Sequence, residues 1–322
     1  MSFWFSPDLW YLALQAMGAL LFVSIGVYLP MRAGVLVLGA EGIMLFGCFG
    51  AVSAEILTGA GAVAGILGAV AASTMASVLF AAVAVSGRVN PIATGIALNF
   101  IAAGGTAVMT AVLFSGTGGA LFAPGLEPLG KVSVPWLDAI PWIGEVLSGQ
   151  TIVVYLAIVA VALLGLWLNR TRGGLTTRVV GSSPAVAMSA GRSPIFVQWL
   201  ALIAGGVFTG LGAAQLALAS AAQFSPGMTN GRGFIALALV LIAATRPWSL
   251  LPLSIVFAYF DTLGFNLQNI GLPTELSGVL PYLVIVMMLT VPTIAGKFGN
   301  GSPSVMGGEA DLSAPASNRL IS

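Results

Sequence analysis

The chain has 322 residues, of which 58% are hydrophobic and only 7% are charged, and its mean hydropathy is +1.04. A soluble domain carries about 25% charged residues, so the composition excludes that class and predicts an all-α, multi-pass membrane protein. The absence of His and the single Cys, Cys48, remove the usual ligands of zinc and haem, the base of a Ser-His-Asp triad and any disulfide framework, so we expect no metal and no cofactor.

Apolar runs bounded by Pro, Gly or charged residues predict about nine membrane-spanning helices, with eight to ten as the range. No basic region precedes the first run and no A-x-A cleavage site follows it, so no removable signal peptide is expected. The exact number of spans between residues 195 and 295 is left open. The nine runs cover residues 9–29, 34–56, 62–86, 91–114, 150–168, 195–219, 232–245, 248–265 and 276–294.

One long segment, residues 115–149, separates the fourth and fifth runs and contains four prolines and two tryptophans. We expect an ordered cap over the outer end of the bundle, with little regular helix because proline interrupts it. This cap is either a docking surface for an external partner or a plain interfacial loop. At the other end of the chain, residues 297–322 are rich in Gly, Ser and Pro and are predicted to be a disordered tail, which leaves a membrane domain over residues 1–296.

Positive charge gathers in residues 169–194, NRTRGGLTTRVVGSSPAVAMSAGRSP, which hold four arginines and no acid. If this stretch is cytoplasmic and the chain crosses at every predicted span, nine of the eleven basic residues fall on the inside. Only Lys131 and Arg232 fall on the outside, in agreement with the positive-inside rule. The N-terminus is then predicted outside and the C-terminus in the cytoplasm.

A short helix is predicted within this basic stretch, from Pro184 to Ala190. Ser183 is suited to the N-cap, Pro184 to the first helical position and Gly191 to the left-handed exit residue. Such a helix is about 10 Å long and cannot cross a bilayer of about 30 Å. It is either an ordinary capped helix in a polar loop or a lever between two membrane helices that a cytoplasmic partner moves.

Polar side chains inside the predicted spans form a second group of candidates. Glu41 lies in the second span, where an unpaired charge costs several kcal/mol, so it is either functional or hydrogen-bonded to a neighbouring helix. The other candidates are Asn99, Gln215, Asp261 and Asn266. They either line a path for a polar, uncharged solute or hold helices together. The chain contains no G-x-x-x-x-G-K-[ST] loop, so another chain must bind ATP if ATP drives transport.

Two stretches resemble one another faintly. Residues 32–47 and 231–244 each begin with a Gly/Arg pair before an apolar run, and they run in opposite directions on the predicted topology. This pattern is typical of the inverted repeats of transporters. Arg232 is expected to cap the short seventh helix by snorkelling, and the alternatives are a place at the mouth of the path or an ion pair with Glu275.

Four motifs in a fixed order carry a resemblance to a known family. They are GVLVLGAEGIMLFGCFGA (34–51), NPIATGIALNF (90–100), TRGGLTTRVVGSSPAVAMSAG (171–191) and FSPGMTNGRGFIALALVLIA (224–243). Together they resemble the permease subunits of bacterial ABC importers, in the branched-chain amino acid and simple sugar permease family and particularly its nucleoside-type members. The resemblance covers nearly the whole chain up to about residue 292.

The resemblance implies a non-enzymatic transport subunit in the lipid of the bacterial cytoplasmic membrane, paired with a second permease subunit that is either a copy or a different chain. It further implies a cytoplasmic ABC ATPase with tandem nucleotide-binding domains and an extracytoplasmic solute-binding lipoprotein, with no nucleic-acid partner. Nucleosides come first as solutes, simple sugars second and branched-chain amino acids third. The rival function is a self-sufficient secondary transporter or channel for a small polar solute.

The resemblance also implies that residues 182–192 form the coupling helix that fits a cleft of the ATPase. The family usually has Glu or Asn-Pro before paired alanines, whereas this chain has Ser182-Ser183-Pro184, so the acid that could form an ion pair with the ATPase is missing. The candidate coupling residues are Arg178, Ser182, Ser183, Pro184, Ala187, Gly191 and Arg192.

Overall fold

The computed structural model describes residues 6–114, 121, 130–132, 143–269, 283, 284, 286, 287 and 290. Within these residues, seven helices are long and apolar enough to cross a membrane, which confirms an all-α polytopic membrane protein. The tail and most of both the predicted ninth span and the 115–149 segment lie outside the described residues, so the total of nine spans stays a prediction. The bundle belongs to residues 1–285, and a second unit, residues 286–322, has three described residues.

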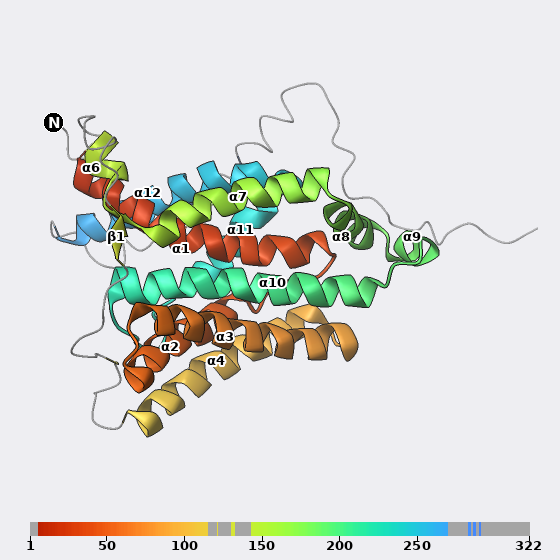
Figure 1. Ribbon diagram of the computed structural model, residues 1–322, viewed down its shortest axis with the longest axis horizontal. Coiled ribbons are helices and arrows are strands. Elements are labelled where there is room, and N and C mark those ends of the chain that lie inside the picture. Colours follow the sequence, from red (N-terminus) through yellow and green to blue (C-terminus); the bar gives the residue numbers. More distant parts are fainter. Residues whose placement is uncertain are drawn as a thin grey trace, which may run out of the picture. The chain divides into compact units, whose positions relative to one another are not determined.

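The long helices are shown in Figure 1 together with the short elements between them. The seven candidate spans are α1 (Pro7–Arg32), α2 (Ala40–Thr58), α3 (Ala62–Ala81) with the π-helical turn η2 (Ala82–Ser86), α4 (Pro91–Leu113), α7 (Ile152–Arg170), α10 (Pro194–Ala214) with the π-helical turn η3 (Gln215–Ala221), and η4 (Pro247–Ser249) with α12 (Leu250–Asn269). The short helices are α6 (Ile143–Leu147), α8 (Arg172–Ser182), α9 (Pro184–Ser189) and α11 (Arg232–Ala243). The strands β1 (Lys131–Val132) and β2 (Gln150–Thr151) pair antiparallel.

The seventh predicted span corresponds to α11, which has 12 residues and is therefore about 18 Å long. That length is too short to cross a hydrocarbon core of about 30 Å, so α11 is a half-length helix rather than a span. Its N-terminus lies inside the bundle, because its first residues contact the start of α2.

Helix α2 also begins inside the bundle. After α1 ends, the chain turns at Gly34, whose φ of 84° favours glycine, and continues without regular structure as far as Gly39. The first turn of α2 then packs against Asn99, which lies eight residues, or about 12 Å, beyond the start of α4. Two helices, α2 and α11, thus start at positions within the bundle.

The packing of the helices follows an approximate inverted symmetry. Helices α1 and α10 run antiparallel through the centre (Figure 1), and they meet at a pair of glycines. A Cβ added to Gly26 would lie 2.6 Å from the carbonyl oxygen of Gly205, and one added to Gly205 would lie 2.5 Å from that of Gly26. Helix α10 packs on α2 and α3, as α1 packs on α11 and α12. This arrangement agrees with the inverted repeat expected from the two similar stretches.

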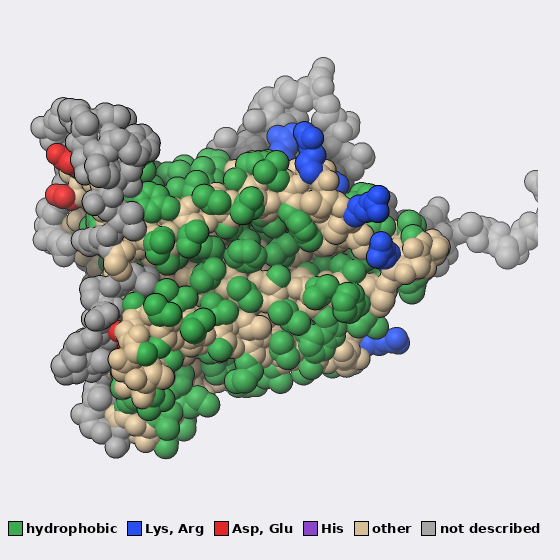
Figure 2. Space-filling view, in the orientation of Figure 1, with side chains coloured by type: hydrophobic (Ala, Val, Ile, Leu, Met, Phe, Trp, Pro, Cys, Tyr) green, Lys and Arg blue, Asp and Glu red, His purple; other side chains and the backbone are tan. Residues whose placement is uncertain are grey.

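Charged side chains separate along the long axis of the bundle. Figure 2 shows Lys and Arg gathered at the end where α8 and α9 lie, and Asp and Glu at the opposite end. On the face that Figure 2 shows, hydrophobic side chains are spread between the two ends, as expected for a surface that faces lipid. We call the end that carries α8 and α9 the basic end.

Candidate functional site

The predicted short helix is present as α9, Pro184–Ser189, one residue shorter than expected. It ends in a Schellman motif, in which the N–H of Gly191 donates to the carbonyl of Met188 and the N–H of Arg192 donates to that of Ala187, both at 2.9 Å. Gly191 has φ 71°, which confirms it as the left-handed exit residue.

The expected hydroxyl cap at Ser183 is wrong. Ser183 does occupy the N-cap position of α9, but its side chain caps no backbone N–H there. The same residue also closes α8, where its N–H donates to the carbonyl of Val179 at 2.8 Å. Ser183 is both the C-cap residue of one helix and the N-cap residue of the next, so its backbone conformation must satisfy α8 and α9 together. Its hydroxyl is therefore not directed at the free N–H groups of α9.

Helix α8 was not predicted from the sequence, since Gly173 and Gly174 in its first turn have low helix propensity. Thr171 caps this helix, with its Oγ1 accepting the N–H of Gly174 at 3.1 Å. A Cβ on Gly174 would lie 2.3 Å from the carbonyl oxygen of Trp167, so glycine lets α8 fold back closely on α7. The i, i+3, i+6 spacing of the buried Gly174, Thr177 and Val180 was the available signal.

Helix α8 rests against the turn that leads from α1 into α2. A Cβ on Gly181 would lie 2.2 Å from the carbonyl oxygen of Arg32, and one on Gly34 would lie 3.1 Å from the Cα of Gly181. From α10, the Nε2 of Gln198 donates to the carbonyl of Ala33 in the same turn at 3.3 Å. The basic stretch is therefore in direct backbone contact with the segment that precedes α2.

The candidate coupling residues differ in their exposure. Ala187 is buried at 1% and holds α9 against the bundle, and Arg178 and Ser183 are partly buried. The exposed candidates are Ser182, Pro184, Gly191 and Arg192. Helix α9 also exposes the apolar side chains of Val186 and Met188. Exposed apolar side chains beside arginines form a surface that suits a protein partner.

Glu41 lies in the first turn of α2 and caps the N-terminus of α11. Its Oε1 accepts the hydroxyl of Thr229 at 2.5 Å and the N–H of Gly231 at 2.9 Å, and its Oε2 accepts the N–H of Gly233 at 2.7 Å. A carboxylate at a helix N-terminus is stabilised by the unpaired N–H groups and by the helix dipole. Glu41 is thus hydrogen-bonded to a neighbouring element that lies 188 to 192 residues away in the sequence.

Asn99 and Gly233 complete this contact. The Nδ2 of Asn99 donates to the carbonyl of Leu38 at 3.0 Å, and its Oδ1 accepts the N–H of Gly42 at 2.8 Å, so Asn99 ties α4 to the start of α2. A Cβ on Gly233 would lie 2.4 Å from the backbone nitrogen of Glu41, which only glycine avoids. We call Glu41, Asn99, Thr229, Gly231 and Gly233 the central junction. The last three were not predicted from the sequence, although the Gly-x-Gly spacing of residues 231–233 was a signal of close backbone approach.

Arg232 forms an ion pair with Asp261 of α12, at 3.0 Å between Nη2 and Oδ2. The expectation of a snorkelling cap is therefore wrong, and Glu275 lies outside the described residues. Asp261 is eleven residues, or about 16 Å, beyond the start of α12, and the two side chains are only 16% and 17% exposed. At this depth a guanidinium needs a partner, which explains the pairing.

The two remaining candidates lie elsewhere in the bundle. Gln215 is fully buried, and its Oε1 accepts the hydroxyl of Thr151 at 2.8 Å. The Nδ2 of Asn266 donates to the carbonyl of Thr262 within α12 at 3.1 Å. The structure therefore brings Glu41 and Asn99 together at the start of α2. It also places Asp261 beside Arg232, which lies between Gly231 and Gly233 of the central junction. Within the described part of the chain, no hydrogen bond or ion pair joins Gln215 or Asn266 to that group.

Comparison with known proteins places the whole bundle in one family. The family described as "Branched-chain amino acid transport system / permease component" matches residues 11–289. The chain belongs to this family. The matched region of the permease contains both the central junction and the basic stretch with α8 and α9.

The permease is similar to several curated proteins over most of their lengths. A putative glucose ABC transporter permease protein of Haloferax volcanii, TsgC13, is 32% identical, with 88% of this chain and 86% of the relative covered. The guanosine ABC transporter permease protein NupQ of Bacillus subtilis is 29% identical, with 89% and 93% covered. The nucleoside ABC transporter permease protein NupC of Lactococcus lactis is 30% identical, with 84% and 88% covered.

Proposed function

We propose that this permease is a membrane-spanning subunit of an ATP-driven ABC importer, with nucleosides as the first solute class and simple sugars as the second. The family match over residues 11–289 carries the proposal, and the names of the relatives for guanosine, nucleosides and glucose support the solute classes. A cytoplasmic ATPase with two nucleotide-binding domains hydrolyses the ATP. A second permease subunit and an extracytoplasmic binding lipoprotein complete the complex.

The charges inside the bundle support an uncharged solute. Glu41 accepts three hydrogen bonds from its own chain, and Arg232 is paired with Asp261. The N-terminus of a half-length helix is a natural place to bind an anionic group, and in α11 the carboxylate of Glu41 already occupies it. Nucleosides and sugars need no fixed charge for recognition, whereas an amino acid carries two. For this reason we rank branched-chain amino acids third among the proposed solute classes, after nucleosides and simple sugars.

Among the five path candidates, Gln215 has the clearest capacity for a further contact. Its Nε2 is buried and has no hydrogen-bond partner in the part of the chain that the structure describes. A buried amide with an unused donor is unfavourable in a closed bundle and becomes available to a polar solute when the bundle opens. We therefore place Gln215 first among the proposed path residues, ahead of Asp261 and Asn266, while the bonds of Glu41 and Asn99 support positioning roles.

The coupling role is proposed for α9 and its neighbours, residues 182–192, together with Arg178. The exposed Val186 and Met188 on α9 provide a surface for a cleft of the ATPase. The contact between Gly181 and the backbone of Arg32 and Gly34 links any movement of α8 to the segment that leads into Glu41. The segment between α1 and α2 is held by α8 at its start and by the central junction at its end. A movement of α8 is thereby passed to α2 and α11, the two helices that start inside the bundle, and their shift would alternate the opening of the solute path.

Uptake by the complete complex tests this function. The permease is expressed with its ATPase, second permease and binding lipoprotein, and the uptake of labelled guanosine, glucose and leucine is measured. The expected result is nucleoside uptake that disappears when the Walker lysine of the ATPase is replaced. Transport by this chain alone, without ATP, would instead identify a secondary transporter or a channel.

The orientation of the basic end is tested separately. Ser182 is exposed on α8, so a Ser182→Cys variant can react with a membrane-impermeant thiol reagent, while the only native cysteine, Cys48, is buried. We expect labelling from the cytoplasmic side only. Labelling of intact cells from the outside would overturn both the proposed topology and the coupling role.

A further inference from the structure

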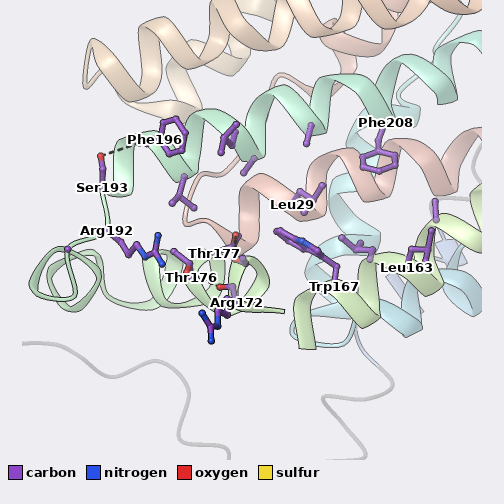
Figure 3. Close-up of a pocket in the computed structure, with 18 residues that line it drawn as sticks. Leu29, Leu163, Trp167, Arg172, Thr176, Thr177, Arg192, Ser193, Phe196 and Phe208 are labelled. Atoms are coloured by element: carbon purple, nitrogen blue, oxygen red, sulfur yellow. Dashed lines mark hydrogen bonds between the residues drawn. The ribbon is translucent and has the colours of Figure 1, made fainter. Parts of the chain in front are cut away.

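An apolar groove lies beside the basic stretch, between α1, α7, α8 and α10 (Figure 3). Its volume is about 860 Å³. Leu29, Leu163, Trp167 and Phe208 line the part of the groove farther from α9, and Phe196 lies nearer to α9. Leu163, Phe196 and Trp167 are exposed, so the groove opens on the outer surface of the bundle rather than into its core. These walls suit a long apolar ligand.

The mouth of the groove differs in chemistry from its walls. Arg172 at the start of α8 and Arg192 after α9 both line it, together with the hydroxyl side chains of Thr176 and Ser193. In Figure 3 the guanidinium of Arg192 extends toward α8, close to Thr176 and Thr177. Both arginines are exposed, and neither has an ion-pair partner within the described residues. No acidic residue lines the groove.

We propose that this groove binds one anionic phospholipid of the leaflet at the basic end. The acyl chains lie along the apolar walls, and the phosphate receives charge-assisted hydrogen bonds from the guanidinium groups of Arg172 and Arg192. Basic pockets between membrane helices on the cytoplasmic side are suited to anionic headgroups. A zwitterionic headgroup carries the same phosphate together with a cation, which the two arginines repel and for which the lining offers no acidic partner, so an anionic headgroup is favoured.

The site has a consequence for the coupling segment. A lipid held there contacts α7 and α10 through its chains and α8 through its headgroup, so it connects the basic stretch to the spanning helices. The lipid site does not depend on which solute is transported. From the proposed function it takes only the assignment of the basic end to the cytoplasmic leaflet. A failure of the uptake experiment would therefore leave the lipid site standing, and the reverse also holds.

Trp167 provides a probe inside the groove, because bromine atoms on acyl chains quench tryptophan fluorescence on contact. The full-length chain, within its complex, is reconstituted in nanodiscs of phosphatidylcholine that contain increasing fractions of either brominated phosphatidylglycerol or brominated phosphatidylcholine. The difference in quenching between the parent and a Trp167→Phe variant isolates this residue. We expect quenching at a lower fraction of the brominated anionic lipid, by roughly fivefold for each arginine involved.

Charge variants separate this site from general attraction to the basic end. Arg172→Gln and Arg192→Gln should each reduce the anionic preference, and the double variant should abolish it. Arg170→Gln removes the same charge two residues away but lies outside the groove lining, so it should keep the preference. The single variants and the titration of the parent protein still decide the question if the double variant does not fold.

Three results would overturn the proposal. Equal quenching by the two brominated lipids would mean ordinary annular lipid. Absence of Trp167 quenching by either lipid would mean that a protein, such as the second permease subunit, covers the groove. Equal loss of preference in Arg170→Gln and in the groove variants would assign the effect to the charge of the whole basic end.

Discussion

The central junction and the basic stretch with α8 and α9 are both built from short helices, glycines and charged side chains, but they treat charge in opposite ways. At the junction Glu41 has three donors, and the neighbouring Arg232 is paired with Asp261. In the basic stretch no arginine has an ion-pair partner among the described residues. Burial makes an unpaired charge costly, so the interior pairs its charges, whereas the surface leaves them for other molecules. We therefore interpret the junction as a structural feature, and the proposed binding roles belong to the basic stretch.

Removing the carboxylate of Glu41 is expected to have the largest effect on stability. Glu41→Ala leaves the hydroxyl of Thr229 and the N–H groups of Gly231 and Gly233 without their acceptor, at about 1 to 3 kcal/mol for each buried donor. The lone Cys48 is buried, so its reaction with a thiol-reactive fluorophore on heating reports unfolding. We expect a clearly lower transition temperature for Glu41→Ala and an intermediate one for Glu41→Gln, which keeps one oxygen. An unchanged transition in the Ala variant would contradict the capping role.

Adding one methyl group at the junction tests its close packing. In Gly233→Ala the new Cβ overlaps the backbone of Glu41 at 2.4 to 2.5 Å, and backbone atoms cannot move aside as a side chain can. Overpacking of this kind costs about 1 to 3 kcal/mol. Gly105 of α4 is the matched control, because it is also helical and an added Cβ meets nothing within 4 Å. We expect the same thermal assay to show destabilisation for Gly233→Ala and none for Gly105→Ala.

The ion pair predicts a pattern of non-additivity. Arg232→Ala leaves Asp261 alone in the bundle, at a cost that we place at about 1 to 3 kcal/mol because both side chains retain some exposure. The double variant with Asp261→Asn removes the unpaired charge as well, so it should unfold at a higher temperature than Arg232→Ala alone. Strictly additive effects of the two substitutions would show that the pair contributes little to the stability of the bundle.

The features that the sequence analysis predicted correctly depend on neighbouring residues. The lengths of the apolar runs predicted the first six spans and α12, because a bilayer sets the length that a helix needs, but α2 starts six residues later than the predicted residue 34. Pro184 and Gly191 marked the two ends of α9 for a similar reason, since their backbone preferences act locally. Local chemistry was sufficient in both cases.

The features that it missed depend on residues far apart in the chain. Helix α8 contains two adjacent glycines that local propensity disfavours, and it is explained only by the close approach of Gly174 to α7 and of Gly181 to Gly34. The partners of Glu41 lie about 190 residues away, and none of the three interpretations of Arg232 paired it with Asp261. Which polar groups meet inside a bundle is decided by tertiary packing, and hydropathy carries no information about it.

The smallest effect on stability, with a large effect on coupling, is expected at the end of α9. Gly191 has φ 71° and open space around it, so Gly191→Val strains the exit turn without disturbing the bundle. Asparagine accepts this backbone conformation far better, so Gly191→Asn is the matched control. We expect both variants to unfold like the parent protein in the Cys48 assay.

The two variants should nevertheless differ in solute uptake and in the assembly of the permease with its ATPase, and only Gly191→Val should be impaired. A Val variant that assembles and transports normally would remove this exit turn from the coupling surface. Such a result would also weaken the comparison between the two regions, because the exposed stretch would then tolerate a change in its backbone geometry. Impairment in Val and retention in Asn would instead show that the partner depends on the path of the backbone after α9.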